Sequence, residues 1–326
     1  MNLACRHEEH GLAPPPGPPD AAPRARAAPP GSRWRQAGLI TLGAVALFVA
    51  VRRLPTGTNL AHVDFQVPGT NVIQFCDPAN PAFLPVVAVK SPVTMTLVFD
   101  APPTTGRAAN ATLALRTFTG RPIGPEDLLV THEHRLHLMV VDPGLGDYQH
   151  VHPVPGRAPG EWGFLLTPRA AGQYRVFADF TPAATARGLY ASADFDVPGR
   201  PAAPVAADNW TGVADGLRCT LTPGAPLRAR DVVTLTLTVE SADGRRPVPL
   251  VPVMGAYAHL VAFDEARSGF AHIHPQPSDL NLHPDPYRPQ LEFRVQIPQA
   301  GRYVIWSQFK TGGREHFVPF WIEVSP

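Results

Sequence analysis

Two histidine-rich segments carry the residues of this sequence whose types and spacing are best suited to chemistry. HLMVVDPGLGDYQHVHP (137–153) and HLVAFDEARSGFAHIHP (259–275) align without a gap. The alignment matches three histidines of each copy, namely His137, His150 and His152 with His259, His272 and His274. Neutral imidazole is the commonest nitrogen ligand in proteins and suits copper, zinc and nickel. The repeat therefore indicates two related candidate metal sites.

The geometry of a β-hairpin explains why these histidines would lie together. Each segment reads as strand, turn, strand, and a turn centred on DPGLGD places His137 opposite His152 and Met139 opposite His150. Opposed side chains in an antiparallel pair have Cβ atoms about 4.5–5.5 Å apart and share one face. The same pairing in the second copy gives two facing pairs, His259 with His274 and Val261 with His272.

Further donors differ between the copies. His132 and His134 precede the first hairpin, where the second copy has Met254 and Ala256. A thioether favours Cu(I), so one site is expected to be His-only and the other Met/His. The second copy also has His283 in a long insertion. The full set of candidate ligands is His137, His150, His152, Met139, His259, His272, His274, Met254 and His316.

A purely structural interpretation of the His-x-His-Pro motif stays open at this stage. One histidine would donate to a loop carbonyl, the other would stack on Trp162 or Tyr174, and the proline would end the strand. The turns DPGLGD and DEARSG share no glycine or proline position, yet the histidines persist in both copies. The persistence of the histidines favours a requirement for their side chains, which either metal binding or a structural role would explain.

Composition narrows the class of protein. The chain has 326 residues, 40 prolines and a formal net charge of +1, with no basic stripe, which argues against nucleic-acid binding. None of the three cysteines lies in a CxxC or CxxCH pattern, so covalent haem and a zinc ribbon find no support. Cys76 and Cys219 form either a disulfide or two free thiols, and a third alternative is that Cys76 is a metal ligand. The sequence has no P-loop, GxSxG or HExxH motif, so no nucleotide and no catalytic residue is assigned.

The chain order predicts an anchored tandem of β-sandwiches. Residues 1–36 form a Pro/Ala/Arg-rich tail that is expected to be disordered, and 37–53 a transmembrane signal anchor. Five arginines before the apolar run and two after it favour an internal N-terminus and an external body. Short β-type runs separated by turns then predict two Ig-like sandwiches, 60–197 and 208–326, joined by a linker at 198–207.

The repeat extends beyond the hairpins and supports the tandem. WGFLLTPRAAGQYRVFADF (162–180) matches LEFRVQIPQAGRYVIWSQF (291–309), including Tyr174 with Tyr303 and Phe177 with Trp306. A glycine followed by x-Tyr is typical of the turn into a late strand of an Ig-like sandwich.

The hairpin sequence, followed by Trp162 and AGQYRVFADFTP, resembles the His-rich part of exported bacterial β-sandwich domains grouped as YtkA-like. The resemblance implies an Ig-like or cupredoxin-like sandwich on the far side of a bacterial membrane, in some cases encoded near copper-handling proteins. It carries over only to His137, His150, His152 and their second-copy partners. The Cys-plus-Met late-strand motif of blue-copper carriers is lacking, so the cupredoxin likeness concerns the fold alone.

The sequence thus predicts a membrane-anchored, exported, non-catalytic protein. It would bind a transition metal, copper foremost, through the paired hairpins, for buffering or for transfer with a donor or acceptor protein. The alternative is an exported interaction module for protein or glycan whose histidines are structural. A third interpretation is an enzyme whose site lies where the two hairpins meet.

Overall fold

The computed structural model describes residues 30–52, 60–65, 83–88, 90–201 and 208–326. It divides into two units, Met1–Pro55 and Thr56–Pro326, and each is described by itself. Most of the predicted disordered tail, most of the linker, and Cys5 and Cys76 lie outside the described residues.

The described part of the N-terminal unit is one helix, α1 (Pro30–Arg52). It extends beyond the apolar run of the sequence, and Arg33–Val51 is long and apolar enough to cross a membrane. At 1.5 Å per residue its 23 residues span about 34 Å, close to the thickness of a hydrocarbon core. An N-terminal secretion signal meets the same criterion. The predicted apolar helix is therefore confirmed, and it fits either a single-pass anchor or a signal sequence.

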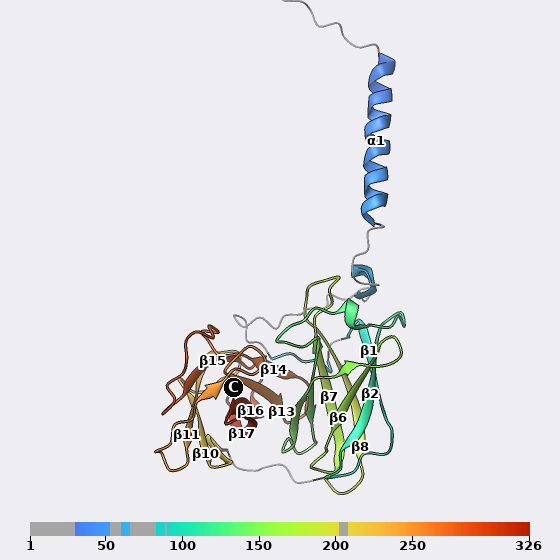
Figure 1. Ribbon diagram of the computed structural model, residues 1–326. Helices are drawn as coiled ribbons and strands as arrows, with labels where there is room; N and C mark the ends of the chain where they lie inside the picture. Colours follow the sequence, from blue (N-terminus) through green and yellow to red (C-terminus); the bar gives the residue numbers. More distant parts are fainter. Residues whose placement is uncertain (1–29, 53–59, 66–82, 89, 202–207) are drawn as a thin grey trace, which may run out of the picture. The chain divides into compact units, whose positions relative to one another are not determined.

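The first sandwich consists of two four-stranded antiparallel sheets (Figure 1). One sheet has the order β1-β2-β6-β5 and the other β4-β3-β7-β8. The strands are β1 (Val93–Phe99), β2 (Ala109–Thr117), β3 (Leu136–Val141), β4 (Tyr148–Val151), β5 (Val154–Pro155), β6 (Glu161–Leu166), β7 (Gly172–Phe180) and β8 (Leu189–Val197). Two short 3-10 helices, η1 (His62–Phe65) and η2 (Pro125–Asp127), accompany them.

The second sandwich repeats this plan. Its sheets have the orders β15-β11-β10-β9 and β12-β16-β13-β14, and β17 also pairs with β16. The strands are β9 (Thr211–Ala214), β10 (Leu217–Pro223), β11 (Val232–Ser241), β12 (Leu250–Val251), β13 (Ala258–Asp264), β14 (Phe270–Ile273), β15 (Gln290–Gln296), β16 (Gly301–Thr311) and β17 (Arg314–Val324). The predicted all-β tandem of sandwiches behind an apolar helix is confirmed.

Strands β3 and β13 are buried on both faces, which explains their nearly continuous apolar sequences. Every residue of β3 is buried, and so is every residue of β13 up to Phe263. Alternate side chains of a strand point to opposite faces, so one set fills its own sandwich and the other must meet a different partner. Leu138 lies in the first core and Leu260 in the second, whereas Met139 and Val261 belong to a third core.

The third core joins the two sandwiches. It contains residues of both copies, with Met139, Val141, Tyr148 and Phe177 from the first and Val261, Phe263, Phe270 and Trp306 from the second. The segment before β1 also contacts the second copy, because Leu84 forms an isolated bridge with Phe270. The outer faces of the two hairpins, which carry the histidines, are therefore turned toward each other.

A tyrosine fixes the turn before the late strand in each copy, as the sequence predicts. The Tyr174 hydroxyl lies 3.2 Å from the carbonyl oxygen of Ala170, and the Tyr303 hydroxyl lies 3.1 Å from that of Gln299. This four-residue return is the tyrosine corner of Ig-like sandwiches. It holds the start of β7 and of β16, the strands that lie beside the histidine hairpins.

Candidate metal centre

The first histidine triad lies on the outer face of the β3–β4 hairpin. Met139 pairs with His150, and Val141 with Tyr148, in the predicted register. His137 comes from β3, His150 from β4, and His152 directly follows β4. The ring of His137 lies 5.4 Å from that of His150 and 4.9 Å from that of His152, centre to centre. One nitrogen of each ring lies within 4.8 Å of the others.

The hydrogen bonds around this triad fix which ring nitrogens carry hydrogen. His137 Nε2 donates to the carbonyl oxygen of Thr131 at 2.9 Å, so its Nδ1 is bare. His150 Nδ1 donates to Oε1 of Gln308 at 2.8 Å, so its Nε2 is bare. The Gln308 amide cannot be reversed, because its Nε2 already donates to the carboxylate of Glu315 at 2.8 Å.

Two nitrogen lone pairs therefore face each other. His137 Nδ1 and His150 Nε2 are 3.3 Å apart, and neither carries a hydrogen in the neutral rings. Two ligands of one tetrahedral ion, each bonded at about 2.0–2.1 Å, would be separated by roughly 3.3 Å. A metal-ligating histidine also commonly donates its other ring nitrogen to a carbonyl or carboxylate, as His137 does to Thr131, while His150 donates to a side-chain amide. Two ligands of one metal ion could take this arrangement, with the cation between them.

The second triad repeats the first on the β13–β14 hairpin, again in the predicted register. Val261 pairs with His272, and His274 directly follows β14. The ring centres of His259, His272 and His274 are 4.8 to 5.3 Å apart, and one nitrogen of each lies within 4.8 Å of the others. All three residues are buried, whereas His150 and His152 are half-buried.

Several buried nitrogens of the triads have no hydrogen-bond partner among the described residues. They are both ring nitrogens of His259 and the Nε2 atoms of His152 and His274. An imidazole buried without a partner costs about 1–3 kcal/mol, so such atoms require an explanation. A metal ion would satisfy them, and the donor set fits copper, zinc or nickel. A structural role alone leaves these nitrogens unexplained.

The two triads lie against each other. The ring centres of His150 and His272 are 5.6 Å apart, and those of His137 and His272 are 6.3 Å apart. Strands β7 and β16 each contribute a polar side chain at this boundary: Gln308 accepts from His150, and an oxygen of Asp179 lies 3.6 Å from His272 Nδ1. The two hairpins thus form one centre of six histidines.

Burial keeps the triad rings neutral at physiological pH. Desolvation lowers the pKa of His137 to about 4, with a further contribution from His150. It lowers the pKa of His150 to about 3 and that of His274 to about 2. The pKa of His259 also falls well below its ordinary value because the ring is buried. Neutral rings coordinate a metal without first losing a proton.

Asp179 has the opposite shift. Burial raises the pKa of its carboxyl to about 6, and the nearby His137 and His132 rings oppose that rise. Asp179 pairs with His137 across β3 and β7. A cation bound beside it would favour the carboxylate, because an opposite charge stabilises the ionised form.

His132 and His134, the extra donors of the first copy, lie beside different triads. The His134 ring stacks on that of His152 at 3.8 Å. The exposed His132 ring lies 4.1 Å from that of His274, in the second copy, and 6.2 Å from that of His137, in its own. His152 therefore stacks on His134, not on Trp162 or Tyr174 as the structural interpretation expects.

The remaining predicted donors have different surroundings. Met139 is fully buried in the third core and faces His150, and Met254 is buried in the turn before β13. His316 contacts Asp215 at 3.1 Å and stacks on Phe309, so its partners lie outside both triads. Cys219 is a free, buried thiol, and burial raises its pKa to about 12.

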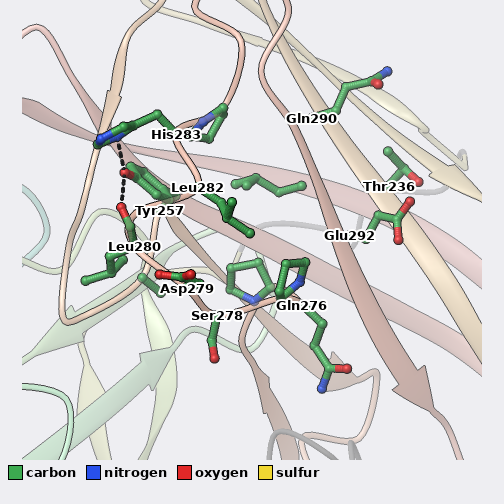
Figure 2. A pocket seen from close by; sticks show the side chains of 15 residues that line it. Thr236, Tyr257, Gln276, Ser278, Asp279, Leu280, Leu282, His283, Gln290 and Glu292 are labelled. Carbon is green, nitrogen blue, oxygen red and sulfur yellow. Dashed lines mark hydrogen bonds between the residues drawn. The ribbon is translucent and has the colours of Figure 1, made fainter.

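His283, the optional donor in the insertion, lines a separate pocket of about 440 Å³ (Figure 2). Its Nδ1 lies 2.6 Å from the hydroxyl of Tyr257, and that hydroxyl donates to the carbonyl of Leu280 at 2.8 Å. Ala256 and Pro275 line the same pocket. The structure therefore gives His283 a place in the loop beside the second hairpin, with Tyr257 as its partner.

The residues that the sequence argument missed are Asp179 and Gln308. They occupy matching positions of β7 and β16, one residue before the aligned pair Phe180 and Phe309. A polar residue immediately before the aligned phenylalanine in both copies was the available signal. The sequence of one copy could not explain this residue, because each side chain contacts a histidine of the opposite sandwich.

Fold and site define a class of protein: a tandem β-sandwich with a histidine centre between its two copies. The chain belongs to the family described as Domain of unknown function (DUF8832), which matches residues 88–197 and again 212–326. The double match confirms the internal repeat, and the family that is shown is neither YtkA-like nor cupredoxin by description. No curated protein matches the chain.

Three solved structures similar to this chain are distant in sequence. A protein described as membrane anchored, from Corynebacterium diphtheriae, is 10% identical with a TM-score of 0.23, and the match covers 72% of this chain and 59% of that one. Fibronectin(III)-like modules of Clostridium thermocellum CbhA are 11% identical with a TM-score of 0.19, covering 71% and 94%. MtrC from Shewanella baltica is 7% identical with a TM-score of 0.21, covering 69% and 68%.

Proposed function

We propose that this chain is an exported, membrane-anchored protein that binds a transition metal, copper foremost, at its two histidine triads. It would hold or pass on the metal without catalysing a reaction. The observation that carries this proposal is the facing pair of bare nitrogens, His137 Nδ1 and His150 Nε2, at 3.3 Å.

The choice of copper rests on ligand chemistry. Imidazole donors suit several divalent metals, and among these the affinity of a given site is generally highest for Cu(II). The triads alone offer three nitrogens each, and their separations of up to 4.8 Å require small ring movements to reach one ion. Met139, Met254 and His316 remain predicted additional ligands.

The membrane and export parts of the proposal rest on α1 and its flanking charge. Arginines are more numerous before the apolar segment than after it. By the positive-inside rule, Thr56–Pro326 would lie outside the cytoplasm, and α1 would stay as the anchor. A metal donor or acceptor protein would reach the centre through the half-buried His150 and His152 and the exposed His132.

Metal analysis of the full chain in detergent tests the proposal. We expect about two copper ions per chain after loading and desalting, one for each triad, since three imidazoles suffice to hold one ion. The double variant His137→Ala/His152→Ala and its counterpart His259→Ala/His274→Ala should each lose one ion. His283→Ala, outside the triads, is the matched control and should lose none. Substoichiometric metal in the unmodified chain, unchanged in both double variants, would contradict the proposal.

A further inference from the structure

The two sandwiches meet with approximate two-fold symmetry, although their sequences differ. His150 contacts Gln308, and the equivalent His272 contacts the equivalent Asp179. The aromatic contacts come in matching pairs as well. Tyr148 lies 5.8 Å from Trp306 and Phe270 lies 5.4 Å from Phe177, while Tyr148–Phe317 at 5.9 Å corresponds to Phe270–Tyr190 at 5.7 Å. In such an isologous arrangement, each contact that a residue of the first copy makes with the second has an equivalent contact in the opposite direction.

The turn before each hairpin has the same backbone in both copies. His132 and Glu133 have positive φ angles of 49° and 70°, and Met254 and Gly255 have 50° and 74°. Each turn is closed by an isolated bridge, Thr131 with His134 and Val253 with Ala256. Two successive positive φ angles define a type I′ turn. His132 and Met254 are therefore the same position of the same turn.

His132 and Met254 are also residues for which this conformation is unfavourable. A non-glycine residue in the left-handed region costs about 1–2 kcal/mol, so it persists where surrounding structure or function requires it. Glycine occupies the next position in the second copy but not at Met254 itself. A specific side chain is thus kept at this position of both turns.

In the first copy, that side chain reaches the opposite triad. The His132 ring lies 4.1 Å from His274, 6.2 Å from His272 and 6.5 Å from His259. All three members of the second triad are therefore within its neighbourhood. By the two-fold relation, Met254 would correspondingly lie beside His152, His150 and His137. Met254 is buried, with 3% of its surface exposed.

We infer that each triad takes its fourth ligand from the turn of the other copy, His132 for the second triad and Met254 for the first. This inference rests on the proposed function and assigns to each site the oxidation state of the copper ion that it binds. Three imidazoles and a thioether select Cu(I), since soft sulfur prefers the reduced ion, whereas four imidazoles select Cu(II). One chain then holds a Cu(I) site and a Cu(II) site side by side.

The test uses the full chain in detergent, with Met254→Leu and His132→Ala as separate variants. Cu(I) affinity is measured by competition with a chromophoric Cu(I) chelator under reducing conditions, and the Cu(II) site by electron paramagnetic resonance. Met254→Leu should weaken one Cu(I) site at least about tenfold and leave the Cu(II) spectrum unchanged. His132→Ala should alter the nitrogen hyperfine pattern of Cu(II) and leave Cu(I) affinity unchanged.

Matched controls separate this assignment from its rivals. Met139→Leu is a third variant, which tests the rival thioether opposite His150. The controls are Met95→Leu, which replaces a buried methionine of the first core, and His134→Ala, which removes the other turn histidine, whose ring stays with its own copy. Neither should reproduce the effect of its counterpart. Thermal unfolding of each metal-free variant verifies that it folds.

The outcomes distinguish two kinds of failure. If the unmodified chain binds two copper ions but Met254→Leu and His132→Ala change neither site, the cross-copy assignment is overturned and the proposed function stands. The same holds if Met139→Leu, not Met254→Leu, weakens Cu(I). If the unmodified chain takes up no stoichiometric copper, both are overturned.

Discussion

Gln308 accepts a hydrogen bond from His150 across the boundary between the two sandwiches, at 2.8 Å. This bond fixes the tautomer of His150 and so aims its bare Nε2 at His137. Asp179 stands in the equivalent position toward His272. Each of these polar side chains contacts a histidine of the opposite sandwich, so each triad depends on the presence of the other sandwich.

Replacing Gln308 tests that dependence. Gln308→Leu leaves His150 Nδ1–H without its acceptor, which should destabilise the metal-free protein by about 1–3 kcal/mol. Loss of such an outer partner should also weaken metal binding at the first triad by roughly 10- to 100-fold. Urea unfolding and copper competition measure the two effects. Gln308→Glu combined with Glu315→Gln keeps both the acceptor for His150 and the hydrogen bond to residue 315, and it should largely restore binding. Equal affinities for the Leu variant and the unmodified chain would refute the role of Gln308.

Removal of metal should lower stability. A ligand that binds only the folded state stabilises it by about 4 kcal/mol at a free concentration roughly 1,000-fold above its Kd. Calorimetry of the full chain should therefore show a higher unfolding temperature with Cu(II) or Zn(II) than with a chelator. The combined variant lacking His137, His152, His259 and His274 should show no metal-dependent shift. A shift that persisted in that variant would place the stabilising ion elsewhere.

Acidification should destabilise the metal-free protein. The folded-state pKa of His137 is about 4 and that of His150 about 3, below the ordinary value for an unfolded histidine of about 6.5. Stability from such groups is fully present above pH ~6.5 and declines as pH falls toward the folded-state pKa, by about 1.4 kcal/mol per pH unit for each histidine.

Protonation of Asp179 has the opposite effect on the stability of the fold, over a nearby pH range. Its pKa of about 6 lies above the ordinary carboxyl value, so its contribution is present at low pH and is lost as pH rises through about 6. Several histidines destabilise the fold on acidification and only one carboxyl stabilises it, so the net effect of acid is a loss of stability. Urea unfolding at about pH 7.5, 6 and 5 with a chelator measures it, and His152→Asn should flatten the slope. Equal stability at all three values would contradict the buried, neutral state of the triads.

The two tyrosine corners should contribute differently to the free energy of unfolding. Tyr174 donates to the buried carboxylate of Asp147 at 2.6 Å and also accepts from the amide of Ala170, whereas Tyr303 bonds the carbonyl of Gln299. Tyr174→Phe should therefore cost about 1.5–3 kcal/mol of unfolding free energy and Tyr303→Phe about 0.5–1.5 kcal/mol. Chemical denaturation of both variants measures the difference, and copper stoichiometry should remain unchanged in each. A reversed order would mean that the Asp147 contact does not stabilise the fold.

The anchor is tested at Gly43, in the middle of α1, where a side chain would meet nothing within 4 Å. Gly43→Arg should oppose membrane insertion by about 2.5–3.5 kcal/mol, whereas Gly43→Leu should favour it slightly. Alkaline extraction of membranes measures the fraction that stays embedded. N-terminal sequencing of the mature chain completes the test: a chain that begins after α1 would show a cleaved signal in place of an anchor.

The sequence alone determined the fold class, the internal repeat, the apolar N-terminal helix and the register of both hairpins. These depend on local patterns, since the two-residue period of a strand and the turn between His137 and His152 fix which side chains share a face. The same patterns explain why the two triads could be named residue by residue.

Only the tertiary structure decided what the histidines face. Nothing local indicates that His150 meets Gln308, that His132 lies against His274, or that His316 has Asp215 as its partner. Those contacts arise because β3 and β13 each have a second apolar face that must be buried, and among the described strands these two faces meet in the third core. Packing of these faces brings two hairpins that the chain order separates into one centre.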